Sequence, residues 1–184
     1  MSFKCKYAKA TIFFMKLNFT KTNGPVDEAM EILTLVQTGK RDLIPLILVD
    51  EPGGTYWSTC VDFFHNKLLA EGYICPSDFS FFEVVDSIDD VIEKISGYYR
   101  LFHSLRYVNG QLVIRLTSAP NAASIKSLKE NFSDMLMPQG DIRLTGPLPE
   151  EDDEPELSGL SRLVLDFDRK SFGRLRSFID EING

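Results

Sequence analysis

Three short apolar runs stand in the first half of the chain, and each is followed by a segment with helical periodicity. Continuous apolar runs rich in β-branched and aromatic residues are typical of strands buried on both faces, as in parallel sheets. Apolar residues that recur every three or four positions predict the helices between them. The β-α-β-α-β-α order therefore predicts a parallel sheet with right-handed crossovers, part of a doubly wound, Rossmann-like α/β fold. The predicted strands cover residues 10–15, 43–49 and 81–85, and Ser87 with Asp90 resembles a capping box for the last of these helices.

The pattern changes after Gly97. Two strand-like runs, 104–108 and 111–116, flank Asn109-Gly110, a strong signal for a type I′ hairpin turn. Further on, helical spacing alternates with two more strand-like runs, which predicts a small α+β unit over residues 101–184. Its remaining segments are a helix with Ile125, Leu128, Phe132 and Met135 on one face, strands at 141–148 and 162–168, and a last helix that Ser171 can cap, with Phe172, Leu175, Phe178 and Ile182 inward.

The composition limits the classes of function. Of the 184 residues, 43% are hydrophobic, which is enough for a folded core, and the net charge is −7. Six of the acids fall in residues 150–156, so the rest of the chain is close to neutral and lacks the clustered Lys and Arg of a general nucleic-acid binder. We interpret residues 149–157 as a solvated acidic linker; the alternative is a docking segment for a basic partner.

Cysteine usage and the N-terminal pattern bear on location. Cys5, Cys60 and Cys75 are odd in number and widely spaced, without a Cys-X-X-Cys motif, so neither a zinc site nor a disulfide framework is indicated. The N-terminus lacks a signal-peptide pattern, and the apolar run at 10–15 is too short to span a bilayer. We therefore predict a cytoplasmic protein that does not contact a membrane.

Residues 24–40, GPVDEAMEILTLVQTGK, predict a helix that follows the first strand. Pro25 suits the first helical turn, where its missing N–H costs nothing, and Asp27 and Glu28 lie near the positive end of the helix dipole. Glu28 and Glu31 are three residues apart and share one face. A strand, a loop and an acidic helix in this order form the unit where a doubly wound sheet usually holds a nucleotide.

This stretch resembles the LONELY GUY (LOG) family, once called lysine decarboxylase-like. The family's hallmark PGGxGTxxE closes a strand and opens a helix, and residues 24–28 look like its last five positions, GTxxE. Residues 43–50 and 54–74 are similar to the family's next strand and helix, and the likeness continues to about Ile95. Two later stretches, HSLRYVNGQLVIRL and FDRKSFGRLRSFID, resemble the C-terminal extension of longer bacterial members. Residues 1–100 thus look like the C-terminal half of a LOG-type domain.

Members of the family are nucleoside 5′-monophosphate phosphoribohydrolases, which cleave an N-glycosidic bond and release the free base. The resemblance implies that Glu28 is the catalytic carboxylate, which stabilises an oxocarbenium-like sugar. It also implies that Gly24, Asp27 and Thr34 contact a nucleoside 5′-monophosphate, and that no metal or redox cofactor takes part. Family members are dimers that bury the acidic helix region, so self-association is expected.

Departures from the family pattern bear on activity. The PGGxG loop is replaced by MKLNFTKTNG at residues 15–24, where only Gly24 remains to let a phosphate approach the backbone, although Lys16 and Lys21 could still hold an anion weakly near the helix start. Pro25 replaces the motif threonine and offers neither a hydroxyl nor an N–H. The family's Arg-Lys pair and the first half of its domain have no counterpart. We therefore expect a chain that is inactive alone. The alternative is a non-catalytic truncated remnant that acts as a subunit or interaction module, by self-association or by pairing with a separate N-terminal half.

Each candidate residue also has a purely structural explanation. Glu28 can be an exposed glutamate that the helix dipole favours, and the Thr34 hydroxyl can bond to its own helix. Gly53-Gly54 lies between strand and helix, where anions often bind, but one such pair also makes a plain tight turn. The two histidines have no partners at the spacing of a metal site or a triad: His65 is expected in mid-helix and His103 near a helix end.

Overall fold

The computed structural model describes residues 10–14 and 24–184. The chain divides into two compact units, Met1–Gly97 and Tyr98–Gly184, close to the boundary expected at residue 100. In the described part of the chain, no helix combines the length and the apolar character that crossing a bilayer requires.

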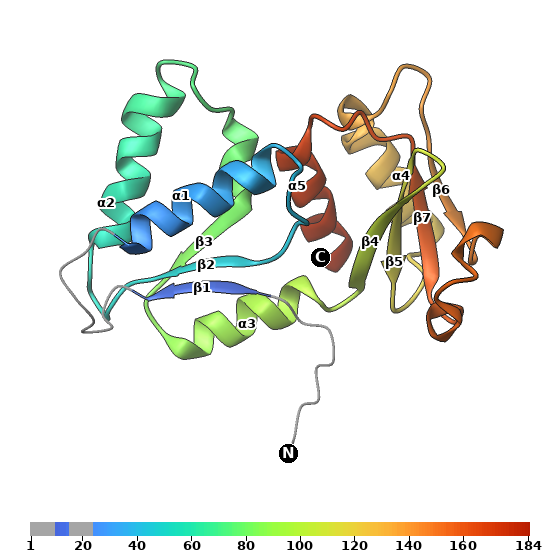
Figure 1. The fold of residues 1–184 in the computed structure, drawn as a ribbon, viewed down its shortest axis with the longest axis horizontal. Helices are drawn as coiled ribbons and strands as arrows, with labels where there is room; N and C mark the ends of the chain where they lie inside the picture. The colour runs from blue at the N-terminus through green and yellow to red at the C-terminus, as the bar shows by residue number, and fades with distance from the viewer. Residues whose placement is uncertain (1–9, 15–23) are drawn as a thin grey trace. The chain divides into compact units, whose positions relative to one another are not determined.

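The first unit is built on a three-stranded parallel sheet with the order β1-β2-β3 (Figure 1). Its strands are β1 (Thr11–Phe14), β2 (Leu46–Val49) and β3 (Phe82–Val85). Its helices are α1 (Gly24–Gln37), α2 (Tyr56–Phe63), which continues as the π-helical segment η1 (Phe64–Leu69), the 3₁₀ helix η2 (Pro76–Phe81) and α3 (Ile88–Tyr98). The parallel α/β fold predicted for this half is confirmed.

Helices cover both faces of this sheet. Successive side chains of a strand point to opposite faces, so the apolar central strand β2 supplies two separate apolar clusters. One cluster joins α1 and α2 to the sheet and the other joins α3 to the opposite face. The first contains Ala29, Leu46, Leu48 and Trp57, and the second contains Ile47, Val49, Val85 and Val91.

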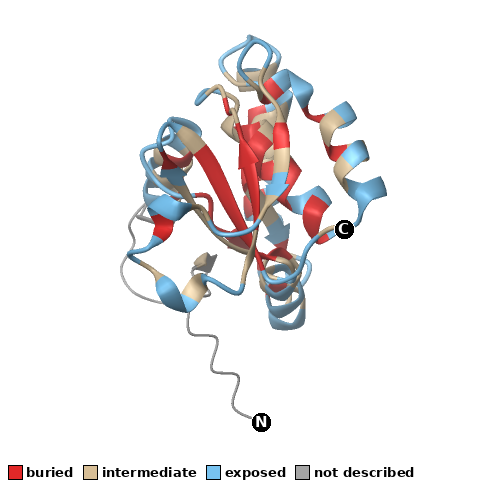
Figure 2. Ribbon diagram, turned by 90° about the vertical axis from the view of Figure 1, so that its right-hand side faces the viewer, coloured by how far each residue is buried: buried red, intermediate tan, exposed pale blue. Residues whose placement is uncertain are grey.

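The second unit is built on a four-stranded antiparallel sheet with the order β4-β5-β7-β6. Its strands are β4 (Phe102–Val108), β5 (Gln111–Leu116), β6 (Ile142–Thr145) and β7 (Ser161–Leu165). Asn109 and Gly110 join β4 to β5 with φ of 48° and 86°, and this pair of positive values confirms the type I′ turn. Buried residues, red in Figure 2, lie mainly along the strands and on the helix faces that pack against them.

Two longer helices complete the second unit, α4 (Ala122–Asn131) and α5 (Phe172–Asn183), with short 3₁₀ helices at Ser133–Met135, Pro149–Glu151 and Pro155–Leu157. Phe132 and Phe178 join α4 to α5, with ring centroids 5.3 Å apart. Ser171 does not cap α5 with its side chain, contrary to the prediction. Its hydroxyl instead donates to Asp168 Oδ2 at 2.6 Å, and Asp168 Oδ1 accepts from the N–H groups of Lys170 and Ser171 at 2.8 and 2.9 Å, so Asp168 closes the turn that precedes the helix.

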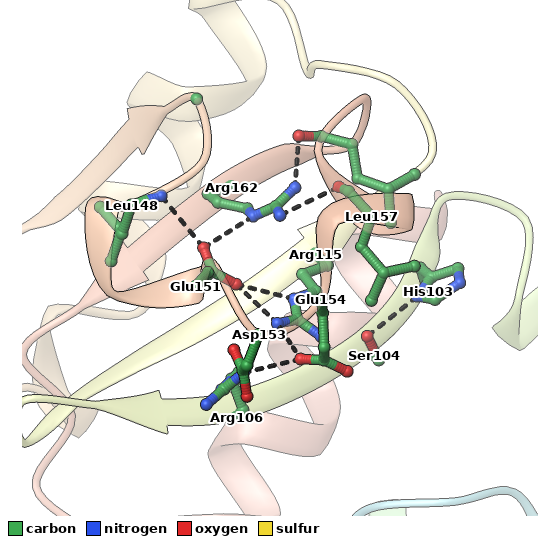
Figure 3. Close-up of polar contacts among 12 residues, drawn as sticks. His103, Ser104, Arg106, Arg115, Leu148, Glu151, Asp153, Glu154, Leu157 and Arg162 are labelled. Atoms are coloured by element: carbon green, nitrogen blue, oxygen red, sulfur yellow. Dashed lines mark hydrogen bonds and ion pairs between the residues drawn. The ribbon is translucent and has the colours of Figure 1, made fainter.

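The acidic segment 149–157, which we call the acidic strap, is exposed at most of its residues, but Glu151 and Glu154 attach it to the sheet (Figure 3). It connects β6 to β7 and contacts Arg115 and Arg162, which lie directly opposite each other on β5 and β7. Two guanidinium groups at one cross-strand position repel each other unless an anion lies between them. Glu151 supplies that anion. Its Oε1 accepts from Arg115 Nε and Nη2 at 2.9 and 2.7 Å, and its Oε2 accepts from Arg162 Nε at 3.0 Å.

The strap is thereby part of the folded second unit. Only 5% of Glu151 is exposed. Burial alone would raise the pKa of this carboxyl, but hydrogen bonds from Arg115, a backbone N–H and Arg162 outweigh it and hold the pKa below its usual value. Glu154 accepts from Arg115 Nη2 at 2.6 Å and from Arg106 Nη1 at 2.7 Å. The sequence alone suggested a solvated segment, because the arginines that pair with its acids lie outside it, on β4, β5 and β7.

Candidate functional site

The carboxyl ends of the three parallel strands lie at one edge of the sheet, which we call the carboxyl edge. Figure 1 shows that α1, α2 and α3 all begin there. Open α/β sheets bind their ligands at this edge, where backbone N–H groups at the helix starts can face a ligand. Three of the four predicted site residues, Gly24, Asp27 and Glu28, belong to the first turns of α1 and therefore to the carboxyl edge.

Glu28 lies exposed on α1, together with Asp27 and Glu31, whereas the neighbouring Ala29 is fully buried against the sheet. Its carboxylate is thus open to solution at the carboxyl edge. A glutamate that faces a nucleotide and one that only complements the helix dipole both occupy such a position. The loop before α1, with Lys16 and Lys21, lies outside the described residues.

Thr34 does not join Glu28 in a common site. Six residues of helix separate them by about 9 Å along the axis and about 120° around it. The Thr34 hydroxyl donates to the Met30 carbonyl in its own helix at 2.8 Å, which is the structural alternative that the sequence left open. Its side chain instead lines a cavity on the other side of α1.

Sequence reasoning missed the acids that line a crevice of about 410 Å³ between β2, β3 and the helices that follow them. Asp50 directly follows β2 and Asp86 directly follows β3. Their positions after predicted parallel strands could have indicated that both lie at the carboxyl edge. Asp90 and Lys94 extend the crevice along α3. Three carboxylates and one ammonium group give this crevice a negative potential, which disfavours phosphate. The remaining lining residues are Gly54, Ser58, Val84 and Val85.

The helix starts at this crevice are occupied by the chain's own side chains. Asp50, 7% exposed, accepts the Trp57 N–H of α2 with its two oxygens at 3.1 and 3.3 Å. Ser87 caps α3, as predicted: its Oγ accepts the Asp90 N–H at 3.1 Å and donates to Asp90 Oδ2 at 2.6 Å. These two N–H groups are thus already satisfied, and the acceptor of the Trp57 N–H is a carboxylate.

Gly53 and Gly54 form a tight turn. Gly53 has φ of 73°, and a Cβ on Gly54 would lie 2.8 Å from the Glu51 carbonyl oxygen. The Gly54 N–H donates to that same oxygen at 2.7 Å. The turn therefore uses the N–H group that an anion would need.

Comparison with known families identifies this unit. Residues 22–95 match the model of the family described as "Possible lysine decarboxylase". These residues therefore form a lysine decarboxylase-like, or LOG-like, domain. No curated protein matches the chain.

The LOG segment, residues 22–95, contains α1, β2, α2, β3 and most of α3, and so includes the whole crevice. The four residues that the resemblance assigns to the site fall within it, with Gly24, Asp27 and Glu28 at the carboxyl edge and Thr34 away from it. The acids Asp50 and Asp86 add a feature of this chain's crevice that the family motif alone did not indicate.

The histidines and cysteines do not converge on the LOG site. His65 belongs to η1 and stacks on Phe79 with a centroid distance of 3.9 Å. His103 lies in β4 and not near a helix end, which corrects the prediction; burial and the charges of Arg115 and Arg162 lower its pKa. Across residues 10–14 and 24–184, no three or more His, Cys, Asp or Glu side chains are grouped to hold a metal ion.

Proposed function

We propose that this chain is a LOG-type protein that does not by itself hydrolyse nucleoside 5′-monophosphates. The observation that carries the proposal is the occupation of helix starts at the carboxyl edge by Asp50 and Ser87. A phosphoribohydrolase needs donors for the phosphate and a carboxylate for the cationic sugar. Glu28 can supply the carboxylate, but the phosphate meets acids and satisfied N–H groups.

The sequence before α1 supports the same proposal. Residues 15–24 offer one glycine where the family motif PGGxG has three, and Pro25 removes an N–H from the helix start. Removing one preorganised donor typically lowers a rate by roughly 10²–10³. Since several donors are absent together, base release should be undetectable.

The direct test is incubation of the purified chain with AMP and related monophosphates, followed by chromatography for the free base. We expect no release above a control without protein. The matched variants are Glu28→Ala and, on the same exposed face of α1, Glu31→Ala. Base release that Glu28→Ala abolishes and Glu31→Ala retains would contradict the proposal, because it would assign the activity to Glu28 and not to a contaminant.

A second candidate function is that of an assembly module, and exposed apolar surface on the first unit supports it. Val84 on the edge strand β3 is 38% exposed, and Ile88 and Ile92, one turn apart on α3, are 56% and 58% exposed. Edge strands and adjoining apolar side chains are typical sites of association. We propose self-association through this surface, with pairing to a separate N-terminal half as the alternative.

Sedimentation velocity tests this second candidate. The wild-type chain should sediment as an oligomer, and Ile88→Ser with Ile92→Ser should shift it towards the monomer. Asp89→Asn, an exposed change on the same helix, serves as the control and should leave the distribution unchanged. A wild-type chain that sediments as a compact monomer at all accessible concentrations would contradict self-association.

A further inference from the structure

A cavity of about 160 Å³ lies in the LOG segment at the end of the sheet opposite the carboxyl edge. Its walls come from the C-terminal half of α1, from η1, and from the residues that lead into β3. The apolar part includes Met30 and Leu33 of α1, Phe64 and Leu68 of η1, and Phe79 of η2. The cavity is partly open to solvent and mainly apolar, with a few polar groups, which is typical of a site for a small ligand.

The wall at Phe64–Leu69 has an unusual backbone. Here α2 changes from α-helix to π-helix, and π-helical turns are rare and frequently found at functional sites. His65 in this segment stacks on Phe79 at an interplanar angle of 14°. This contact fixes the Phe79 ring, which lines the cavity.

The volume sets the size of the occupant. Apolar cavities of about 150 Å³ lined by Leu, Ile and Phe side chains hold one benzene-sized molecule. A cavity of about 160 Å³ with Phe and Leu walls therefore accommodates a single six-membered ring with a short substituent.

One end of the cavity is polar, and its charge is negative. Asp78 lines the cavity and is half-buried. Its Oδ2 accepts from Gln37 Nε2 at 2.7 Å and from the Cys75 N–H at 2.9 Å, so the carboxylate is held in place by α1 and by the start of η2. None of the described residues donates a hydrogen bond to Oδ1. The lining contains no Lys, Arg or His, so the charge of Asp78 is not neutralised within the cavity.

We propose that this cavity binds a small arylalkylamine, with the ring between the Phe64, Leu68 and Phe79 side chains and the ammonium group at Asp78 Oδ1. The apolar walls select the ring and the fixed carboxylate selects the cation, because a charge-assisted hydrogen bond is stronger than a neutral one. The site is separate from the carboxyl edge, so it does not depend on whether the chain binds or hydrolyses nucleotides.

Three probes with the same ring and different charge test the proposal: benzylamine, benzyl alcohol and benzoate. Binding is measured by calorimetric titration of the full chain and by the increase in melting temperature. Benzylamine should bind at least about tenfold more tightly than benzoate, since the first gains a charge-assisted hydrogen bond and the second meets a like charge. AMP should not displace benzylamine.

Variants separate the two parts of the site. Asp78→Asn keeps an oxygen that can accept the Cys75 N–H but removes the charge. It should therefore lower the affinity for benzylamine and leave the affinity for benzyl alcohol nearly unchanged. Leu33→Phe should fill the cavity and lower the affinity for both of these probes. Asp62→Asn, an exposed change on α2 away from the cavity, is the matched control and should bind all three probes as the wild type does.

Several results would overturn the proposal. These are benzoate binding as tightly as benzylamine, Asp78→Asn leaving benzylamine affinity unchanged, or no binding of benzylamine by the folded wild-type chain up to its solubility limit. If Leu33→Phe does not fold, Asp78→Asn still decides the outcome through the ratio of the benzylamine and benzyl alcohol affinities.

Discussion

The carboxyl edge and the acidic strap are the two regions where acidic side chains gather, and they use these acids differently. At the carboxyl edge, Asp50 satisfies a backbone N–H at a helix start, and the neighbouring Asp86 remains exposed. In the strap, Glu151 is buried between two arginines that oppose each other across a sheet. The first region therefore presents acids and satisfied N–H groups at two helix starts, whereas the second is held together by ion pairs.

In both regions, the group that pairs with an acid decides what the acid does. A side chain that caps a helix exchanges a hydrogen bond with water for one from a backbone N–H, and this exchange contributes about 1 kcal/mol to the free energy of unfolding. A carboxylate between two buried guanidinium groups removes a repulsion as well as forming hydrogen bonds, and its loss leaves Arg162 as a buried charge without its anionic partner. Substitutions in the strap should therefore have larger effects on stability than substitutions at the carboxyl edge.

The largest effect is expected for Glu151→Ala. It leaves the buried Arg162 without an anionic partner and Arg115 with Glu154 alone, which should lower the free energy of unfolding of the second unit by about 3–5 kcal/mol. Denaturant unfolding followed by circular dichroism, with hydrogen exchange of β5 and β7, measures it. Glu156→Gln, at an exposed strap position, should change the value by no more than about 0.5 kcal/mol. If the two substitutions lowered the free energy of unfolding equally, Glu151 would be solvated like Glu156.

A smaller effect is expected at low pH through Asp166 in the same unit. Hydrogen bonds from Arg143 and Gln111 lower the pKa of this carboxyl from 3.8 to about 2. Because the folded-state pKa lies below the unfolded value, the stabilisation is complete above about pH 4 and is lost as the pH falls from 4 to 2. The loss is about 2 kcal/mol at most.

Unfolding free energies of the wild type and Asp166→Asn, compared between pH 5 and pH 2, check this prediction. The difference between the two proteins should shrink as the pH falls. A difference that stays constant over this interval would mean that Asp166 does not titrate with a lowered pKa. The fluorescence of Trp57, the one tryptophan of the chain, reports on the first unit and serves as the internal control.

A still smaller effect is expected for Asp50→Ala at the carboxyl edge. Loss of the cap on α2 should lower the free energy of unfolding of the first unit by about 1 kcal/mol. Trp57 lies at this helix start and its fluorescence follows the transition. Asp86→Ala, at an exposed acid of the same crevice, should be nearly neutral. A larger loss of stability in Asp86→Ala than in Asp50→Ala would contradict the assignment of Asp50 as the cap of α2.

The sequence predicted the features that depend on local pattern. The parallel order of β1, β2 and β3 followed from continuous apolar runs, and the turn at Asn109-Gly110 followed from residues that tolerate positive φ. The cap by Ser87 was also local, since its partner is three residues away.

Features that depend on distant partners were not predicted. The burial of Glu151 depends on Arg115, 36 residues away, and on the register that places Arg115 opposite Arg162. Ser171 does not cap α5, because its hydroxyl donates to Asp168 in a turn between β7 and α5 that no periodicity reveals. The cavity beside α1 likewise arises where an α-helix becomes a π-helix, which the spacing of apolar residues does not distinguish.

We expect acids and satisfied N–H groups to close the carboxyl edge to nucleoside monophosphates. A titration of the isotope-labelled chain with AMP to millimolar concentration, following the amide shifts of residues 15–28, 54–58 and 86–90, tests this expectation. We predict no saturable shift at these positions. Saturable shifts at residues 24–28 that Glu28→Ala weakens would contradict the expectation and would identify α1 as part of a working nucleotide site.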